Sequence, residues 1–221
     1  MTQLIVFDMA GTTVDEDNVV YKTVHKALER AGFSFTFEEV LESAAGKEKK
    51  HALSDLMAKH QVTDEEKINA CFEDFKNLLK HAYQDLQVKS MPKAEETFKQ
   101  LREKGIKVAL NTGYDQTTVD TLLTKLGWTE GSTVDAIVNA SMVSKARPEP
   151  DMILKAMELT GITDSSAVMK VGDSIIDIEE GKNASCGKSI GITTGAHTRE
   201  QLETASPDAV ISSLEELHAL L

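Results

Sequence analysis

Short apolar runs recur along this chain, at its start and through its second half. They occupy residues 4–7, 106–110, 136–140, 167–171, 188–193 and 208–211. Each run is rich in Val and Ile and bounded by turn residues, as buried parallel strands are. Segments with helical spacing alternate with the later runs, at residues 92–104, 115–126, 149–160, 175–185, 198–204 and 213–220. This alternation predicts βαβ crossovers and a Rossmann-like, doubly wound parallel sheet, which is an α/β fold.

Residues 16–89 break this rhythm. The segment contains no convincing strand, and its apolar residues follow helical spacing. Its polar ends, VDEDN and QVKSMP, resemble linkers. We therefore expect a helical cap domain at 16–89, inserted into an α/β core domain made of residues 1–15 and 90–221. Two linkers of this kind allow a hinge.

Charge and composition narrow the classes of partner. The net charge of −12 argues against nucleic acid or an anionic membrane as a partner, since both need basic patches. No apolar run approaches the roughly 18 residues that span a bilayer, and the first residues lack the features of a signal peptide. Two isolated cysteines, Cys71 and Cys186, predict a reducing, cytoplasmic location. The sequence does not determine the oligomeric state, and a homodimer is one alternative.

Polar and small residues follow the first four predicted strands. In open parallel sheets, ligands bind at the carboxyl ends of the strands, near the point where the strand order reverses. The residues in these positions are Asp8 after the first strand, Asn111, Thr112 and Gly113 after the second, Lys145 and Arg147 in the loop after the third, and Asp173 after the fourth, with Asp177 one turn into the next helix. We expect them to converge on one site.

Three of these residues are carboxylates. Asp8, Asp173 and Asp177 offer the hard oxygen ligands that Mg²⁺ takes in proteins. An aspartate can also serve as the covalent nucleophile in phosphoryl transfer. A lone aspartate at a strand end is more often a cap or turn residue. The prediction therefore depends on all the motifs occurring in order, each after a separate strand.

The remaining residues suit a phosphoryl group. Thr112 and the amide of Gly113, at a helix N-terminus, can hold phosphate oxygens. Arg147 or Lys145 supplies a further cation for the phosphoryl charge. The sequence thus predicts a site for a small anionic phospho-substrate.

With these motifs in place, the chain resembles the haloacid dehalogenase superfamily over nearly its whole length. The matching residues are Asp8 with Gly11 and Thr12, then Thr112, then Arg147, and finally Asp173 with Asp177. The inserted helices match the α-helical cap of that superfamily. The resemblance implies that Asp8 becomes phosphorylated. It also implies the Mg²⁺ ligands, namely Asp8, the backbone carbonyl of Ala10 and Asp173, with Asp177 in a supporting role.

Ala10 is a departure from the phosphatases of this superfamily, which carry at that position an aspartate that protonates the leaving group. Without such an acid, P–O cleavage loses a factor of about 10² to 10⁴. The stretches FDMAGTTVD, NTGYD and VGDSIIDIEEGKNA resemble one branch, the phosphonoacetaldehyde hydrolases. These enzymes cleave a P–C bond with a cap lysine that forms a Schiff base with the substrate aldehyde. The resemblance implies that this step needs no acid beside the nucleophile.

The cap sequence AAGKEKKHALSDLM, residues 44–57, offers three lysines. At about 100° per residue, Lys49 falls within the apolar sector of the helix, whereas Lys47 lies opposite it and Lys50 on its flank. Counted from Gly46, Lys49 also takes the place of the phosphonatase lysine in the resemblance. We expect it to point into the cleft between cap and core. Partial desolvation and two neighbouring ammonium groups should lower its pKa.

Several alternatives stay open at this stage. Lys49 either forms an imine, binds the charge of the substrate without covalent chemistry, or belongs to a solvated helix face. His51 is a candidate for a second cap acid or base, and Tyr114 for a residue that lines the cleft.

Other functions also fit parts of the sequence. The compact C-terminal segment resembles that of phosphoglycolate phosphatase relatives, which favours a phosphomonoester phosphatase as the alternative enzyme. A catalytically inactive phospho-ligand binding protein is a further alternative, because position 10 lacks an acid. The phosphate site and the carboxylates for Mg²⁺ argue against C–halogen hydrolysis.

Overall fold

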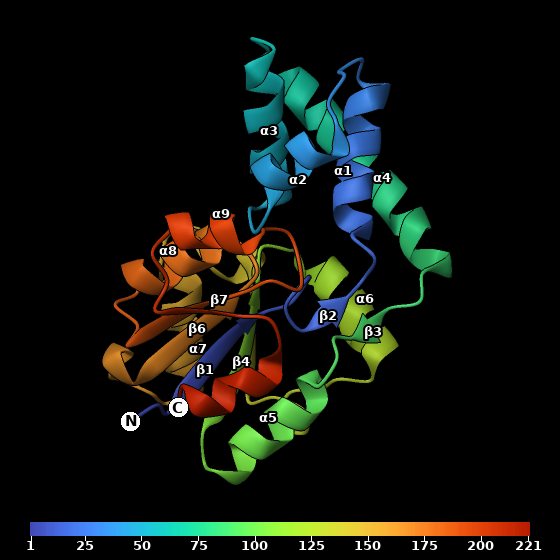
Figure 1. Ribbon diagram of the computed structural model, residues 1–221. Helices are drawn as coiled ribbons and strands as arrows, with labels where there is room; N and C mark the ends of the chain where they lie inside the picture. The colour runs from blue at the N-terminus through green and yellow to red at the C-terminus, as the bar shows by residue number, and fades with distance from the viewer.

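A six-stranded parallel sheet forms the centre of the molecule (Figure 1). The computed structural model describes residues 1–221, except for the side chains of residues 84 and 85. In the order β5-β4-β1-β6-β7-β8, the strands are β5 (Ala136–Asn139), β4 (Lys107–Thr112), β1 (Leu4–Asp8), β6 (Val168–Gly172), β7 (Lys188–Ile192) and β8 (Ala209–Ile211). The predicted α/β fold is confirmed. The order reverses at β1, so the carboxyl end of β1 lies at the switch point where ligands bind in such sheets.

Helices cover both faces of the sheet, because successive side chains of each strand point to opposite faces. They are α5 (Ala94–Glu103), α6 (Gln116–Leu126), α7 (Asp151–Thr160), α8 (Ile175–Asn183) and α9 (Arg199–Thr204). Leu4 and Val6 of β1 belong to the same buried cluster as the apolar residues of α7. Ile5 and Phe7 belong to the opposite cluster, where the Phe7 ring lies 5.4 Å from the ring of Phe98 in α5. This alternation makes the sheet doubly wound.

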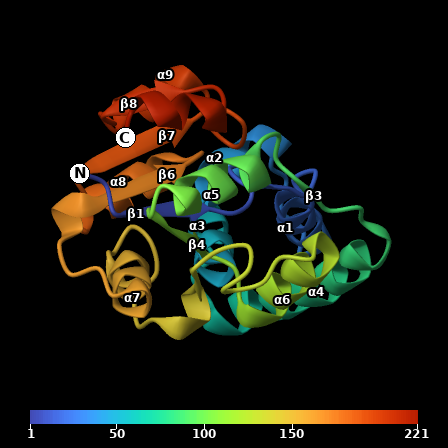
Figure 2. The ribbon, with the colours of Figure 1, turned by 90° about the horizontal axis from the view of Figure 1, so that it is seen from below.

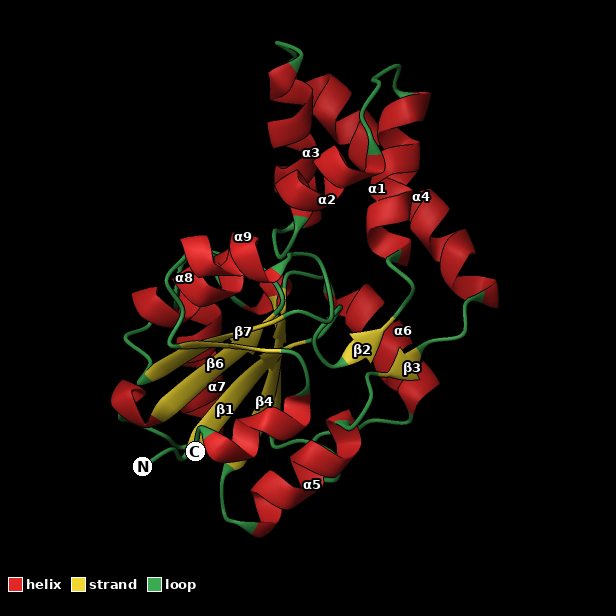
Figure 3. Ribbon diagram, viewed as in Figure 1, coloured by secondary structure: helices red, strands yellow, loops and turns green.

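Four helices lie between β2 (Val14–Asp15) and β3 (Lys89–Ser90) along the chain and stand beyond the sheet, at the top of Figures 1 and 3. They are α1 (Val19–Arg30), α2 (Phe37–Ala44), α3 (Lys49–Lys59) and α4 (Glu65–Asp85). Each turns its apolar side inward, as Val20, Val24 and Leu28 of α1 illustrate, since all three are fully buried. This group of helices, α1 to α4, is called the cap, and it covers the edge of the sheet at which the strands end.

The chain crosses between sheet and helices twice, and the two crossings pair with each other. Strand β2 (Val14–Asp15) runs antiparallel to β3 (Lys89–Ser90), with Val14 opposite Ser90. The sequence predicts only polar linkers at these positions. The backbone pairing of β2 and β3 holds the two connecting segments together. The four helices therefore join the sheet through one short two-stranded ribbon rather than through two independent linkers.

The C-terminal segment differs from the expected helix at 213–220. It forms a 3₁₀-helix, η3 (Leu214–Ala219), in addition to two short ones, η1 (Ala140–Met142) and η2 (Ser165–Ala167). Leu214 and Leu217 are both buried, and a spacing of three aligns them on one side of a 3₁₀-helix, which has three residues per turn. Viewed from below, both chain ends lie close together, away from the cap (Figure 2). Within the described part of the chain, every helix is too short or too polar to cross a bilayer.

Candidate active site

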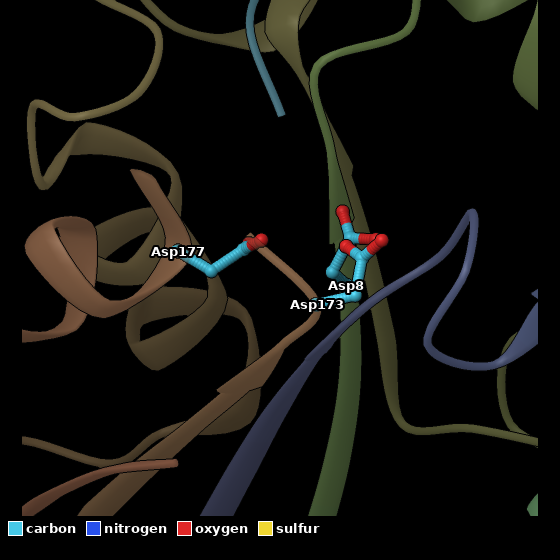
Figure 4. A group of neighbouring side chains, drawn as sticks. All are labelled: Asp8, Asp173 and Asp177. Carbon is cyan, nitrogen blue, oxygen red and sulfur yellow. The ribbon is translucent and has the colours of Figure 1, made fainter. Parts of the chain in front are cut away.

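Three aspartates meet at the carboxyl end of the sheet (Figure 4). Asp8 ends β1, Asp173 follows β6, and Asp177 lies in the first turn of α8. Each offers a carboxylate oxygen, and these oxygens all lie within 4.8 Å of one another. All three side chains are buried. Parallel pairing of β1 with β6 brings them together, because it places the ends of the two strands side by side.

The three carboxyl groups differ in how far protein cations compensate their charge, and hence in their pKa values. Burial raises the pKa of Asp8 to about 6, against the lowering effect of Arg147. Burial also raises the pKa of Asp173 well above its usual range, and the charges of Asp8 and Asp177 add to the effect. Burial works in the same direction on Asp177, but Arg147 and Lys170 outweigh it and hold that pKa below its usual range. Asp177 is therefore paired within the protein, whereas Asp8 and Asp173 favour a further cation.

Arg147 is the protein cation nearest to Asp8. Its Nη1 donates to Asp8 Oδ1 at 2.7 Å and lies 3.1 Å from Asp177 Oδ1. Its Nε donates to Glu180 at 3.0 Å, and its Nη2 donates to the side chain of Asn111 at 2.7 Å. With all of these acceptors the guanidinium is fully buried and held in one orientation. Lys145, the alternative cation from the sequence, is exposed. The structure thus places Arg147, and not Lys145, beside Asp8.

Sequence reasoning missed two charged residues beneath this site. Lys170 lies in the middle of β6 with no exposed surface, and its Nζ contacts Asn111 Oδ1 at 2.6 Å, Asp177 at 2.9 Å and Glu180 at 3.3 Å. Glu180 is also fully buried, one turn after Asp177 in α8. A lysine inside the apolar run at 167–171 was the available signal. It marks a strand position whose side chain reaches buried carboxylates.

The donor set fits a hard divalent cation. Among the side chains that the structure describes, eight charged ones from Lys, Arg, Asp and Glu are buried, and they comprise Lys49, Arg147, Lys170, Asp8, Glu16, Asp173, Asp177 and Glu180. With all of them ionised, five carboxylates and three cations leave two negative charges, which is the charge that one Mg²⁺ neutralises. The Ala10 carbonyl accepts none of the hydrogen bonds of its loop within the described residues, whereas the Met9 carbonyl accepts from three backbone amides and from the Thr13 hydroxyl. Carboxylate and carbonyl oxygens are the ligands that Mg²⁺ prefers.

Gly11 makes room for this cluster. Its φ of +82° lies in the left-handed region, and a Cβ at this position would overlap the carboxylate of Asp173 and approach the Cα of Gly195 to 2.9 Å. Any larger residue would therefore displace the carboxylate of Asp173. The backbone conformation and the close approach both require glycine here.

Thr112 and Gly113 lie at the end of β4, beside Asp8. The strand register places Asp8 opposite Asn111, so that Thr112 is one residue beyond the same edge. Thr112 Oγ1 accepts a hydrogen bond from the amide of Tyr114 at 3.3 Å. A Cβ on Gly113 would lie 2.9 Å from the carbonyl oxygen of Gly46, so the cap loop packs directly on this glycine. The loop expected to bind phosphate oxygens is thus in contact with the cap.

Lys49 is the first residue of α3 and only 5% exposed. Its Nζ donates to the carbonyl oxygens of Ala44 and Lys47, the former at 3.3 Å. The ammonium also lies over two aromatic rings, 5.0 Å from the ring centroid of Tyr21 and 5.4 Å from that of Tyr114. Tyr114 belongs to the core loop after β4. The amine is therefore enclosed between cap and core.

Burial lowers the pKa of Lys49 to about 8, whereas the charges of Glu16 and Asp8 act to raise it. The direction agrees with the prediction from sequence, but the expected contribution of two neighbouring ammonium groups is wrong. Lys47 is neutralised by Asp55 at 2.6 Å, and Lys50 extends to Glu65 at 3.8 Å. Helix geometry separates these side chains from Lys49 more strongly than adjacency in sequence suggests.

His51 is not part of the site. Its side chain is 69% exposed, and its Nε2 lies 3.5 Å from Asp55 on the outer surface of α3. A residue two positions after Lys49 points about 200° away from it around the helix. The second cap acid or base that the sequence suggested is therefore absent at this position.

Comparison with known proteins places this architecture in a family. The model of the haloacid dehalogenase-like hydrolase family matches residues 5–192. Over 217 residues the chain is 30% identical to the bifunctional phosphonoacetaldehyde hydrolase/aminoethylphosphonate transaminase of Clostridioides difficile (strain 630); the match covers 90% of this chain and 33% of that longer protein. It is also 30% identical over 225 residues to the phosphonoacetaldehyde hydrolase of Bacillus mycoides (strain KBAB4), covering 93% and 82% of the two chains.

A solved structure shares the fold. The crystal structure of a phosphonoacetaldehyde hydrolase-like protein from Oleispira antarctica superposes with a TM-score of 0.86 at 23% identity, covering 99% of this chain and 91% of that one. Because the family model matches residues 5–192, the chain belongs to the haloacid dehalogenase-like hydrolases. Within that family it falls in the branch that resembles the phosphonoacetaldehyde hydrolases.

Proposed function

We propose that this protein is a Mg²⁺-dependent hydrolase that cleaves the P–C bond of a small phosphonate aldehyde such as phosphonoacetaldehyde. The observation that carries the proposal is the buried amine of Lys49, enclosed between cap and core with a pKa of about 8. An amine of lowered pKa is what imine formation near neutral pH requires. The names of the relatives support the same substrate class.

In the first step, the neutral amine of Lys49 adds to the aldehyde carbonyl of the substrate. Loss of one water gives an imine between Nζ and the aldehyde carbon, and protonation of its nitrogen makes it an electron acceptor. We assign Thr112 and the amide of Gly113 to the phosphonate oxygens, and their position at the end of β4, beside Asp8, supports this assignment. Arg147 donates to Asp8, Glu180 and Asn111 from a buried position, so we assign it the role of a fixed positive charge beside the nucleophile.

In the second step, a carboxylate oxygen of Asp8 attacks phosphorus and the P–C bond breaks. The bonding pair moves into the protonated imine, so that Lys49 carries an enamine and Asp8 carries the phosphoryl group. Protonation of the enamine carbon and hydrolysis of the resulting imine release the aldehyde. A further water hydrolyses the aspartyl phosphate, which restores Asp8 and releases inorganic phosphate. No acid at the position of Ala10 is needed for the bond-breaking step.

The ligands that we assign to Mg²⁺ are Asp8, the Ala10 carbonyl and Asp173, with Asp177 in a supporting role. Two features support this assignment: the meeting of the three carboxylates and the pairing of Asp177 with Arg147 and Lys170. When bound, the ion neutralises the charge that builds on the phosphoryl oxygens.

A substrate panel tests this proposal directly. Phosphonoacetaldehyde and a set of phosphomonoesters, including phosphoglycolate, are incubated with the protein in Mg²⁺ or in chelator, and released phosphate is measured. We expect release from phosphonoacetaldehyde in Mg²⁺ only. Preferential release from a phosphomonoester would favour the phosphatase alternative, and no release from any compound would favour a binding protein.

Trapping of the imine tests the role of Lys49. Treatment with borohydride in the presence of phosphonoacetaldehyde should reduce the imine to a stable secondary amine on the peptide that contains Lys49. Lys49→Arg keeps the positive charge but cannot form an imine, so both trapping and phosphate release should be lost. Lys50→Arg is the matched control and should retain both. An active enzyme with an unmodified Lys49 would reject covalent catalysis.

A further inference from the structure

Glu16 is a buried carboxyl group with no part in the steps described above. It lies between β2 and α1, where the chain enters the cap, and it is only 2% exposed. Its Oε2 accepts a hydrogen bond from the hydroxyl of Tyr83, near the end of α4, at 2.6 Å. Its Oε1 accepts one from the hydroxyl of Tyr114, in the core loop after β4, at 2.7 Å. One side chain thereby joins the cap entry, the last cap helix and the core.

Lys49 shares one of these tyrosines with Glu16. The Lys49 ammonium lies 5.4 Å from the ring centroid of Tyr114, and the hydroxyl of the same ring is bonded to the carboxylate. When two opposite charges are buried near each other, removing one of them destabilises the folded protein, because the remaining charge is left without compensation. Burial of Lys49 and burial of Glu16 therefore depend on each other. His51, which sequence reasoning considered as a second cap acid or base, points to solvent.

The groups around Lys49 act on its amine in a definite order. The charge of Glu16 favours the ammonium form most, followed by Asp8 and Glu48, whereas Arg147 disfavours it. The rings of Tyr21 and Tyr114 flank the ammonium as neutral groups, since burial raises the pKa of both phenols well above the usual range. Burial likewise raises the pKa of Glu16, to about 7, against the opposing hydrogen bonds from Tyr83 and Tyr114.

We propose that Glu16 is the positioning residue of the Lys49 amine: its carboxylate fixes the ring of Tyr114 on which Nζ rests and provides the buried negative charge that compensates the ammonium. This inference rests on the proposed function, because it gives Glu16 a role in holding in place the amine that attacks the aldehyde. Glu16 also ties the end of α4 to the core, so that the amine is held in place when the cap is closed over Asp8.

Competitive acetylation measures the protonation state of the Lys49 amine without any substrate. The native protein and Glu16→Gln are treated briefly with acetic anhydride between pH 6 and 10, and modification of the Lys49 peptide is quantified by mass spectrometry. We expect the midpoint of the pH dependence to fall by about one unit in Glu16→Gln, the usual scale for one nearby charge. Opening of the cap would instead solvate the amine and move the midpoint upward, because burial is what lowers the pKa of Lys49.

Glu48→Gln is the matched control, since it makes the same chemical change one residue before Lys49. The two oxygens of Glu48 accept from the amides of Lys50 and His51 on a half-buried side chain, so the solvated charge should matter less and the midpoint should stay near that of the native protein. Equal midpoints in Glu16→Gln and in the native protein would overturn the inference.

A second variant keeps the test decisive if Glu16→Gln does not fold. Tyr114→Phe keeps the ring and the carboxylate but removes the donor to Oε1, which favours protonation of Glu16. The midpoint of Lys49 should then fall in the same direction by a smaller amount, and an unchanged midpoint would contradict the proposal. If phosphonoacetaldehyde is not cleaved, the proposed function fails, whereas the acetylation midpoints still test Glu16.

Discussion

At the scale of single residues, the chemistry of this site depends on which buried charges have partners. Asp177 is compensated by Arg147 and Lys170, and its pKa is lowered. Asp8 and Asp173 are less well compensated, and their pKa values are raised. The same burial acts on Lys49 in the opposite sense, because it disfavours an ammonium as it disfavours a carboxylate. One desolvated edge of the sheet thus tunes both the assigned nucleophile and the assigned imine former.

Replacement of Asp8 tests the nucleophile. We expect Asp8→Asn to reduce phosphate release by at least about three orders of magnitude, since no neighbouring group replaces a nucleophilic carboxylate. Asp15→Asn makes the same change on an exposed residue of β2 and should leave phosphate release unaltered. Thermal unfolding of both variants shows whether they are folded. Substantial turnover by folded Asp8→Asn would assign the chemistry to another residue.

The pKa of Lys49 predicts the pH dependence of imine trapping. A lysine attacks a carbonyl only as the neutral amine, so the rate should rise about tenfold per pH unit below the pKa. Because that pKa is about 8, the rate should level off above pH 8. An unperturbed lysine would give a rise that continues beyond pH 10. Initial rates of reductive trapping between pH 6 and 10 distinguish these two curves.

At the scale of elements, the site is assembled where a cap loop meets a core loop. The loop before α3 brings the carbonyl of Gly46 against Gly113, and Lys49 follows three residues later at the start of α3. Strands β2 and β3 pair where the chain enters and leaves the four cap helices. The placement of Lys49 over the sheet is therefore set by a loop contact and a ribbon, each made from residues far apart in sequence.

Gly113→Ala tests this contact between loops. The added Cβ would lie 2.9 Å from the carbonyl oxygen of Gly46 and 3.0 Å from that of Lys47, so the cap loop must move. We expect kcat/KM for phosphonoacetaldehyde to fall roughly 10- to 100-fold, the scale on which small displacements of a reacting group act. The melting temperature serves as the control, because displacement of the cap loop should leave the sheet intact. Native kcat/KM in this variant would show that the contact does not position Lys49.

At the scale of the whole molecule, the buried charge and the overall charge have the same sign, because both are negative. The chain carries a net charge of −12, and its buried charged side chains add to two negative charges at the end of the sheet. An anionic substrate therefore needs a compensating cation within the site. Asp8, Asp173 and Asp177 lie where such an ion would reach both the carboxylates and the substrate.

Thermal stability in the presence of Mg²⁺ tests whether a divalent cation compensates this negative charge. An ion that binds only the folded protein stabilises it by about 2.7 kcal/mol at a concentration of 100 times its Kd. We expect the melting temperature to rise with Mg²⁺, to return to its starting value in chelator, and to respond little to NaCl of matched ionic strength. Asp173→Asn should remove most of the response. A melting temperature that is independent of Mg²⁺ in the native protein would argue against the assigned site.

The sequence by itself determined the α/β core and the positions at which polar residues follow the strands. Strand and helix periodicities are local properties, so the six predicted strands agree with the structure to within one or two residues at each end. The parallel order then follows from the alternation of strands and helices. Asp8 and Asp173 were identified for the same reason, since a residue at the end of a buried strand lies at a known edge of the sheet. Arg147, in the longer loop after β5, was one of two candidate cations, and the structure placed it rather than Lys145 beside Asp8.

Only the tertiary structure decided which charges are buried and what compensates them. Glu16 lies in a segment that reads as a polar linker, and it is buried because Tyr83 and Tyr114, from distant parts of the chain, enclose it. Lys170 and Glu180 likewise depend on partners across the sheet. The state of a buried charge is set by its spatial neighbours, and spacing along the sequence does not specify them. The pKa of Lys49 therefore became explicable only with cap and core together.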